Sequence, residues 1–317
     1  LGEGYTVLPV LVYNEYMSES AINPNMASAL SVIIVLCSLL ILTFQKYVVD
    51  RKNYMMSSLR PPQEVQLKGA KRFWASLPVY LVTFLAFLPQ IVVVCQSFVE
   101  RSFSGVVQGI NLSNYQAMLK RLSTNITNTY VFSLVAIVFI ILFGILVSYI
   151  LVRKKGKVAS LIDTLIMFPY VIPGSVLGIG LIVAFNRKPI VLVGTAAIMI
   201  ISYVVRKLPY TVRSGSAFLY QMDPFIEEAS INLGVSPMKT FFTVTARMML
   251  PGILSGAVLS WITCINELSS SIMLYSGKTS TIAVAIYQEV TRMSDGTAAA
   301  LATILTVTTI ISLLIVF

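Results

Sequence analysis

Long apolar runs dominate this chain and restrict it to folds that cross a membrane. Each run is about 20 residues long, which is the length that an α-helix needs to span the hydrocarbon core of a bilayer. Only 11% of the 317 residues are charged, whereas a soluble domain carries about 25%. We therefore expect an all-α, polytopic membrane protein with about seven transmembrane helices. The predicted spans are residues 27–45, 78–98, 127–152, 162–185, 190–206, 252–275 and 298–317.

The basic residues give these predicted spans an orientation. If residues 1–26 lie outside the cell and the segments alternate, the inner segments carry most of the 23 lysines and arginines, including Arg206 and Lys207. This bias follows the positive-inside rule, so membrane topology rather than nucleic-acid binding accounts for the net charge of +10. The loop 213–251 then lies in the cytoplasm. We expect a multi-pass protein of the bacterial cytoplasmic (inner) membrane.

The sequence lacks the residue patterns on which most catalytic and metal sites depend. It contains no histidine, and its three cysteines lie inside apolar runs without the CxxC spacing of a metal or redox site. No serine–histidine pairing or dense carboxylate group is present either. We therefore expect no enzymatic activity, no metal site and no cofactor on this chain.

Two parts of the chain resemble each other and suggest a tandem duplication. Ala27–Ile33 resembles Ala298–Ile304, and Thr6–Glu15 resembles Thr281–Glu289 with a small gap. A chance likeness between apolar helices is the alternative. On the duplication hypothesis, the rest of a first copy is fused ahead of this sequence. The expected parts are the tail of that first copy over 1–45, a cytoplasmic linker and elbow over 46–77, and a second, six-helix copy over 78–317.

Two positions inside the predicted spans are unfavourable in a regular apolar helix. The run Phe168–Gly174 contains two prolines and a glycine, and a broken helix is tolerated at membrane depth where protein or water surrounds the freed backbone groups. Glu267 lies within the sixth span, where a charge costs about 2.5–3.5 kcal/mol. We expect Pro173, Gly174, Asn266 and Glu267 to line a translocation path. The alternatives are a simple kink and an interhelical hydrogen bond that fixes packing.

A polar helix–turn–helix is predicted between the fifth and sixth spans. Asp223 followed by Pro224 is typical of an N-cap and a first helical turn. Gly234 fits the left-handed position that ends a helix, and Ser236 followed by proline starts a second one. Leu250–Gly252 is expected to end that second helix at the membrane surface. Such a rigid element outside the bilayer is typical of a docking site for a soluble partner.

This segment resembles the EAA loop of permease subunits in ABC importers. Glu228, Ala229 and Gly234 match the motif, while Ser230 stands at its second alanine and Ala246–Arg247 stands at its later Leu–Pro pair. In that family the loop forms a coupling helix that docks in a groove of a cytoplasmic ATPase. The coupling residues that the resemblance implies are Glu227, Glu228, Ala229, Gly234 and Ser236.

The run Glu267–Tyr275 is similar to a signature of the fused, two-copy permeases of the ferric-iron branch. The resemblance implies a permease core driven by a separate ABC ATPase dimer, which binds ATP and Mg²⁺, and supplied by an extracytoplasmic solute-binding protein. Ferric iron is the expected solute, with thiamine, phosphonate, polyamine and oxyanions left open. An ion-gradient-driven secondary transporter and a non-transporting membrane scaffold or insertase are the other hypotheses.

Overall fold

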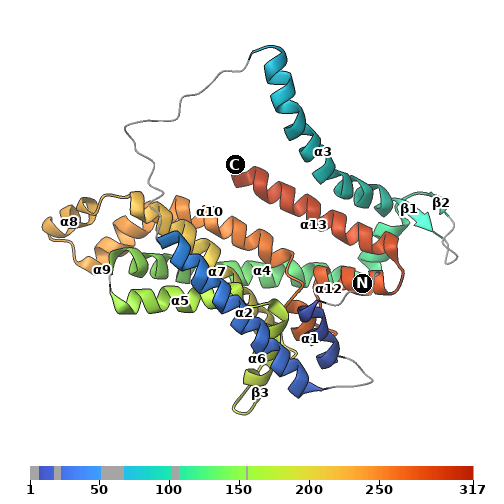
Figure 1. Cartoon of the computed structure of the whole chain (residues 1–317), viewed down its shortest axis with the longest axis horizontal. Helices are drawn as coiled ribbons and strands as arrows, with labels where there is room; N and C mark the ends of the chain where they lie inside the picture. The colour runs from blue at the N-terminus through green and yellow to red at the C-terminus, as the bar shows by residue number, and fades with distance from the viewer. Residues whose placement is uncertain (1–6, 18–22, 51–67, 102–106, 155, 317) are drawn as a thin grey trace.

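The computed structural model describes residues 7–17, 23–50, 68–101, 107–154 and 156–316. Within them the fold is helical apart from two short antiparallel strand pairs, which confirms the predicted all-α membrane class (Figure 1). The strands are β1 (Val99–Arg101), β2 (Val107–Ile110), β3 (Asn186–Arg187) and β4 (Ile190–Val191). The helices are α1 (Leu8–Met17), α2 (Pro24–Asp50), α3 (Ala70–Ser97), α4 (Ser113–Arg153), α5 (Lys157–Val171), α6 (Gly174–Phe185), α7 (Ala196–Gln221), α8 (Phe225–Asn232), α9 (Pro237–Thr240), the π-helical turn Phe241–Thr245, α10 (Ala246–Ile265), α11 (Ser271–Leu274), α12 (Ile282–Thr291) and α13 (Asp295–Val316).

Helices α4, α7 and α10 form the centre of the bundle, and small residues bring α7 and α10 together. A Cβ atom added at Gly252 would lie 2.4 Å from Cβ of Phe218, and one at Gly256 would lie 2.7 Å from Cβ of Ser214. Neither distance is possible for real atoms, so the close approach depends on both glycines. The Gly252-x-x-x-Gly256 spacing therefore marks a helix contact.

Each predicted span overlaps a helix of the structure. Among the described residues, four helices are long and apolar enough to cross a membrane, and the pair α5–α6, bent by 109°, makes up to five. The four are α3, α4, the continuous helix Pro237–Ile265 and α13. The predicted span 27–45 lies within α2. Of the predicted span 190–206, the residues from Ala196 onward are helical, in α7, while Ile190–Val191 form β4. The predicted break at Pro173–Gly174 is present between α5 and α6.

Helix α7 extends beyond Arg206, the predicted end of the fifth span, and continues to Gln221. Within this helix Arg206 and Lys207 are paired with Glu267. Residues 213–221 of the predicted cytoplasmic loop 213–251 are therefore helical. The side of the membrane on which this segment lies stays a prediction.

The predicted end of the second loop helix at Leu250–Gly252 is wrong, because the helix continues through these residues as α10. The helix begins at Pro237, passes through the π-helical turn and Pro251, and ends at Ile265. Proline is tolerated in a membrane helix that packs against its neighbours. Here α7 packs alongside, and the Ser214 hydroxyl donates to the Gly252 carbonyl, next to Pro251, at 2.7 Å. The predicted single span 252–275 is instead interrupted after Ile265 and followed by the short helix α11.

Candidate functional site

The loop between α7 and α10 has the capped geometry that its sequence predicts. The Asp223 carboxylate accepts a hydrogen bond from the Phe225 N–H at 3.0 Å and so caps α8. Gly234 has φ of 86°, and its N–H bonds to the Ile231 carbonyl at 2.9 Å while the Val235 N–H bonds to the Ser230 carbonyl at 3.2 Å. This pair of bonds is a Schellman motif. It turns the chain sharply from α8 into α9.

Ser236 occupies the N-cap position of α9, with Pro237 in the first turn. Its side chain makes no capping hydrogen bond, so its backbone conformation alone sets the start of the helix. The hydroxyls of Ser230 and Thr240 lie 2.9 Å apart and join α8 to the end of α9. The two helices therefore form one rigid unit, and we call residues 223–240 the α8–α9 loop.

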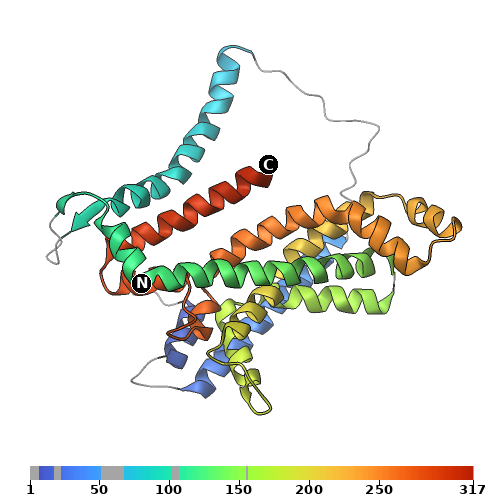
Figure 2. The same ribbon diagram turned by 180° about the vertical axis from the view of Figure 1, so that it is seen from behind.

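The α8–α9 loop exposes apolar side chains at one end of the molecule (Figures 1 and 2). None of the residues of α8 is buried. Phe225 is 70% exposed, Leu233 is 85% exposed and Met238 is 69% exposed. Glu228 and Ala229 are exposed among them. An apolar surface rimmed by polar groups marks an interaction site.

Glu227 has a different environment from its neighbour Glu228. Its Oε1 atom lies 2.9 Å from Nε of Arg153 at the end of α4, and both side chains are largely shielded from solvent. A second guanidinium nitrogen of Arg153 donates to the Met222 carbonyl at 3.5 Å. Glu227 therefore holds α8 against α4. The sequence interpretation treats Arg153 only as a topological charge and misses this contact.

A buried charge cluster lies at the break between α10 and α11. Glu267 is 5% exposed, and its carboxylate contacts Nη1 of Arg206 and lies 2.5 Å from Nζ of Lys207. The Ser270 N–H and hydroxyl also donate to it, at 3.1 Å and 3.2 Å. We call Arg206, Lys207 and Glu267 the charge cluster. An acid inside a predicted span requires a cation nearby, but the sequence does not show that α7 supplies two.

Gly174 joins the charge cluster to the broken fourth span. A Cβ atom added at Gly174 would lie 2.5 Å from Cβ of Ser269 and 2.6 Å from Nη1 of Arg206. Only glycine leaves room for the guanidinium at the start of α6, with Pro173 at its N-cap position. The structure thus brings Gly174 and Glu267 together through Arg206. A path-lining role for these residues stays a prediction.

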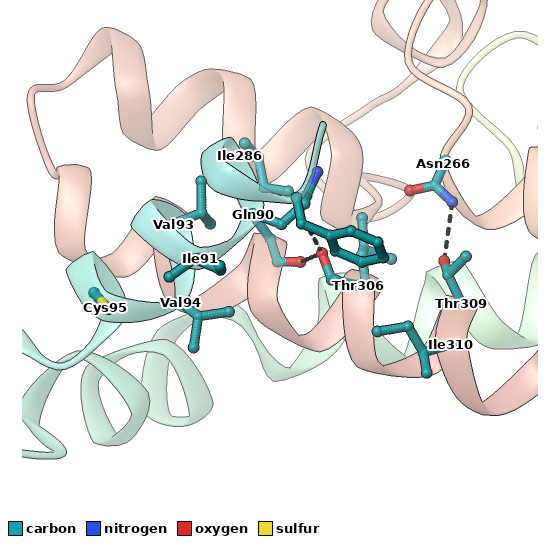
Figure 3. A pocket seen from close by; sticks show the side chains of 13 residues that line it. Gln90, Ile91, Val93, Val94, Cys95, Asn266, Ile286, Thr306, Thr309 and Ile310 are labelled. Carbon is teal, nitrogen blue, oxygen red and sulfur yellow. Dashed lines mark hydrogen bonds between the residues drawn. The ribbon is translucent and has the colours of Figure 1, made fainter. Parts of the chain in front are cut away.

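Asn266 lies apart from Glu267 and faces a different part of the molecule. It lines an apolar pocket of about 640 Å³ between α3, α10 and α13. Figure 3 shows its amide directed toward Thr309, with Nδ2 3.4 Å from Oγ1. In the same pocket the Thr306 hydroxyl donates to Oε1 of Gln90 at 3.3 Å. The structure therefore does not place the four predicted path residues in one site.

Residues 140–317 match the family described as binding-protein-dependent transport system inner membrane component. The chain belongs to this family, the inner-membrane permease subunits of ABC importers. Solved structures share the fold: a bacterial ABC transporter that imports alginate superposes with a TM-score of 0.60 at 17% identity over 78% of this chain and 93% of that one. The methionine ABC transporter MetNI has a TM-score of 0.53 at 18% identity, over 63% and 95% of the two chains.

Similar proteins of known class include ferric transport permeases. The ferric transport system permease protein FbpB of Actinobacillus pleuropneumoniae is 29% identical over 93% of this chain and 43% of its own length. The putative FbpB 1 of Haemophilus influenzae is 29% identical over 88% and 45%. The molybdenum permease ModB of Escherichia coli is 31% identical over 49% and 74%. The chain thus spans less than half the length of the two ferric relatives.

Proposed function

We propose that this chain is the solute-translocating part of an ATP-driven importer and that a cytoplasmic ATPase dimer binds the α8–α9 loop. The observation that carries the proposal is the exposed apolar surface of that loop, with Leu233 85% exposed on a turn made rigid by Gly234. An exposed apolar surface of this kind marks a site that a partner protein covers. Glu228, Ala229 and Ser236 lie on the same loop and complete the proposed contact.

The connections of the loop suggest how movement of the ATPase reaches the membrane. The Arg153–Glu227 ion pair links α8 to α4, and the continuous helix Pro237–Ile265 links α9 to the break beside Glu267. Closure of the ATPase dimer on ATP and Mg²⁺ would pull on both connections and switch the route between inward-facing and outward-facing states. The chain itself would carry out no covalent chemistry.

Ferric iron, delivered by an extracytoplasmic binding protein, is the solute that we propose. Support comes from the two ferric permeases, which align with about nine-tenths of this chain. An oxyanion is the second candidate, because the charge cluster pairs two cations with one carboxylate and the molybdate relatives align with about half of the chain. Thiamine, phosphonate and polyamine stay as alternatives with no such observation in their favour.

Reconstitution tests the proposal. The permease in liposomes, with its ATPase inside and its binding protein outside, should take up radiolabelled ferric iron only when ATP is present; molybdate serves as the oxyanion probe. Uptake driven by a proton or sodium gradient without ATPase would instead establish the secondary-transporter alternative. Failure of an ATPase to co-purify would support a scaffold or insertase.

The Gly234→Pro variant tests the loop. Proline fixes φ near −65° and removes the N–H, whereas Gly234 has φ of 86° and donates to Ile231. We expect ATPase binding and uptake to fall at least tenfold while the membrane helices stay folded. Gly277→Ala is the matched control, because Gly277 also has open space around it but an ordinary φ, and this variant should behave as the native protein.

A further inference from the structure

Two helix pairs far apart in the sequence are built in the same way. The pairs α1–α2 and α12–α13 each consist of a helix of 10 residues, a turn and a long apolar helix. In the first turn the Glu15 carbonyl accepts the Asn23 N–H at 3.1 Å, and in the second the Glu289 carbonyl accepts the Ser294 N–H at 2.9 Å. In each turn the carbonyl of the corresponding glutamate accepts the closing bond, which spans eight residues in the first pair and five in the second.

The long helices of the two pairs also begin in the same way. The Asn23 carbonyl accepts the Ala27 N–H at 3.1 Å before α2, and the Ser294 carbonyl accepts the Ala298 N–H at 3.1 Å before α13. Three buried positions recur at a constant offset in the sequence. They are Ala27, Leu30 and Ile34 in α2, and Ala298, Leu301 and Leu305 in α13.

A chance likeness between apolar sequences does not predict matched turn bonds and matched buried positions. These observations favour the duplication hypothesis for the two pairs. On that hypothesis Tyr13-Asn-Glu15 corresponds to Tyr287-Gln-Glu289. The loop of the first pair is longer, which is the small gap in the sequence likeness.

The two equivalent tyrosines contact each other. The ring centroids of Tyr13 and Tyr287 are 6.5 Å apart in an edge-to-face arrangement of 77°, and α1 lies beside α12 in both views (Figures 1 and 2). When a two-fold axis relates two copies, equivalent residues meet only at the axis. The axis would then pass midway between the two ring centroids, which are 6.5 Å apart.

Apolar side chains pack around the tyrosine pair. Val12, Leu30 and Ile34 of the first pair join Ile179 of α6 and Met273 of α11 in one apolar cluster. Burial, together with the neighbouring Tyr287 and Tyr275, raises the pKa of Tyr13 to about 12, so its phenol stays neutral. The pair lies over α6 and α11, each of which follows a break in a membrane helix.

We propose that the Tyr13–Tyr287 contact lies on a local two-fold axis relating α1–α2 to α12–α13 and forms the outer gate of the translocation route. This inference rests on the proposed transport function. A route between two related copies runs along the axis that relates them, so side chains on the axis obstruct it from both copies at once. Both tyrosines lie in segments predicted to be outside the membrane, and the rings must separate when solute enters.

Leakage through the purified permease, without ATPase or binding protein, tests the gate. Liposomes carrying the Tyr13→Ala/Tyr287→Ala variant should lose trapped chloride at least tenfold faster than native liposomes, because the rings that obstruct the route are removed. The Tyr13→Phe/Tyr287→Phe variant keeps both rings and should stay tight. If the alanine variant is folded and equally tight, the pair is only a packing contact and the gate is refuted.

Cross-linking tests the axis separately. In a background in which Cys37, Cys95 and Cys264 are replaced, Tyr13→Cys/Tyr287→Cys should react with a short bis-methanethiosulfonate, which joins the two thiols through disulfides and releases methanesulfinate. The cross-link should stop ATP-driven uptake until a reductant cleaves the disulfides. The control is Leu36→Cys/Val307→Cys, at equivalent exposed positions of α2 and α13, which lie apart in both views (Figures 1 and 2).

The outcomes separate the gate from the importer itself. No cross-link at positions 13 and 287 would refute the axis, and a cross-linked protein with normal uptake would refute the gate. ATP-driven uptake by the native protein, in which the tyrosine pair is intact, tests the transport function on its own. The gate proposal can therefore be refuted without refuting the proposed transport function.

Discussion

Arg206, Lys207 and Glu267 place three charges inside a bundle that the membrane surrounds. Removing one member of a buried ion pair leaves its partner uncompensated, which is more costly than never burying the pair. Arg206 and Lys207 are consecutive residues of α7 that contact different oxygens of Glu267. At the residue scale, the cluster therefore has one redundant cation and no redundant anion.

This asymmetry predicts unequal effects of substitution. Glu267→Gln should lower the stability of the purified protein by about 3–5 kcal/mol, because two cations lose their counter-ion, and the loss is measured as a fall in the apparent Tm in detergent. Arg206→Gln should be milder, because Lys207 still neutralises the acid. The double variant should recover part of the loss. Equal stability of Glu267→Gln and native protein would contradict a structural role for the cluster.

Single glycines determine how closely α7 and α10 pack. Gly252→Ala should lower the apparent Tm, with a destabilisation of about 1–3 kcal/mol, because its Cβ would lie 2.4 Å from Cβ of Phe218. Gly180→Ala is the control, since nothing lies within 4 Å of a Cβ added there. If the two variants melt at the same temperature, the close approach of α7 and α10 is not needed.

At the scale of elements, the α8–α9 loop is connected to the membrane helices at two points. One is the Arg153–Glu227 ion pair at 2.9 Å, and the other is the uninterrupted helix from Pro237 to Ile265. The π-helical turn Phe241–Thr245 lies where the second connection leaves the loop. Such turns occur frequently at functional sites. Together the connections transmit a force on the loop to α4 and α10.

Breaking the first connection should uncouple the loop without unfolding the bundle. In Arg153→Gln we expect the ratio of solute transported to ATP hydrolysed to fall several-fold, measured in proteoliposomes. The charge exchange Arg153→Glu/Glu227→Arg should restore it. Arg213→Gln is the control, because the Arg213–Asp163 pair is more exposed and exposed pairs contribute about 0–1 kcal/mol. A native ratio in Arg153→Gln would show that α8 does not act through α4.

At the scale of the whole molecule, the orientation of the bundle decides between the functional hypotheses. The importer requires the α8–α9 loop on the inner side and the turns near Lys278 on the outer side. Helix α3 stands away from the body except where it meets α13 (Figures 1 and 2). Its apolar window has no buried residue, so this helix faces lipid or a further membrane segment.

Cysteine labelling measures this orientation directly. In intact cells, a membrane-impermeant thiol reagent should modify Lys278→Cys but not Lys239→Cys. In permeabilised cells the reagent should also modify Lys239→Cys. Both lysines are exposed, so burial does not limit either reaction. Labelling of position 239 from outside would place the α8–α9 loop on the wrong side for an ATPase and would refute the importer mechanism.

The sequence by itself determined the membrane class and the α8–α9 loop. Both depend on local physics: apolar runs of bilayer length need helices, and Asp223, Gly234 and Ser236 fix caps and a turn through their own backbone and side-chain chemistry. The break at Pro173–Gly174 was predictable for the same reason. These features hold whatever the rest of the chain does.

Only the tertiary structure decided where the helices end and which groups meet. Arg206 and Lys207 look like residues at the end of a span until Glu267, from another helix, neutralises them inside the bundle. Glu227 looks free until Arg153 reaches it from α4, and Asn266 turns away from its neighbour Glu267 toward α13. Each outcome depends on a contact between residues far apart in the chain. Local periodicity and capping patterns do not predict such contacts.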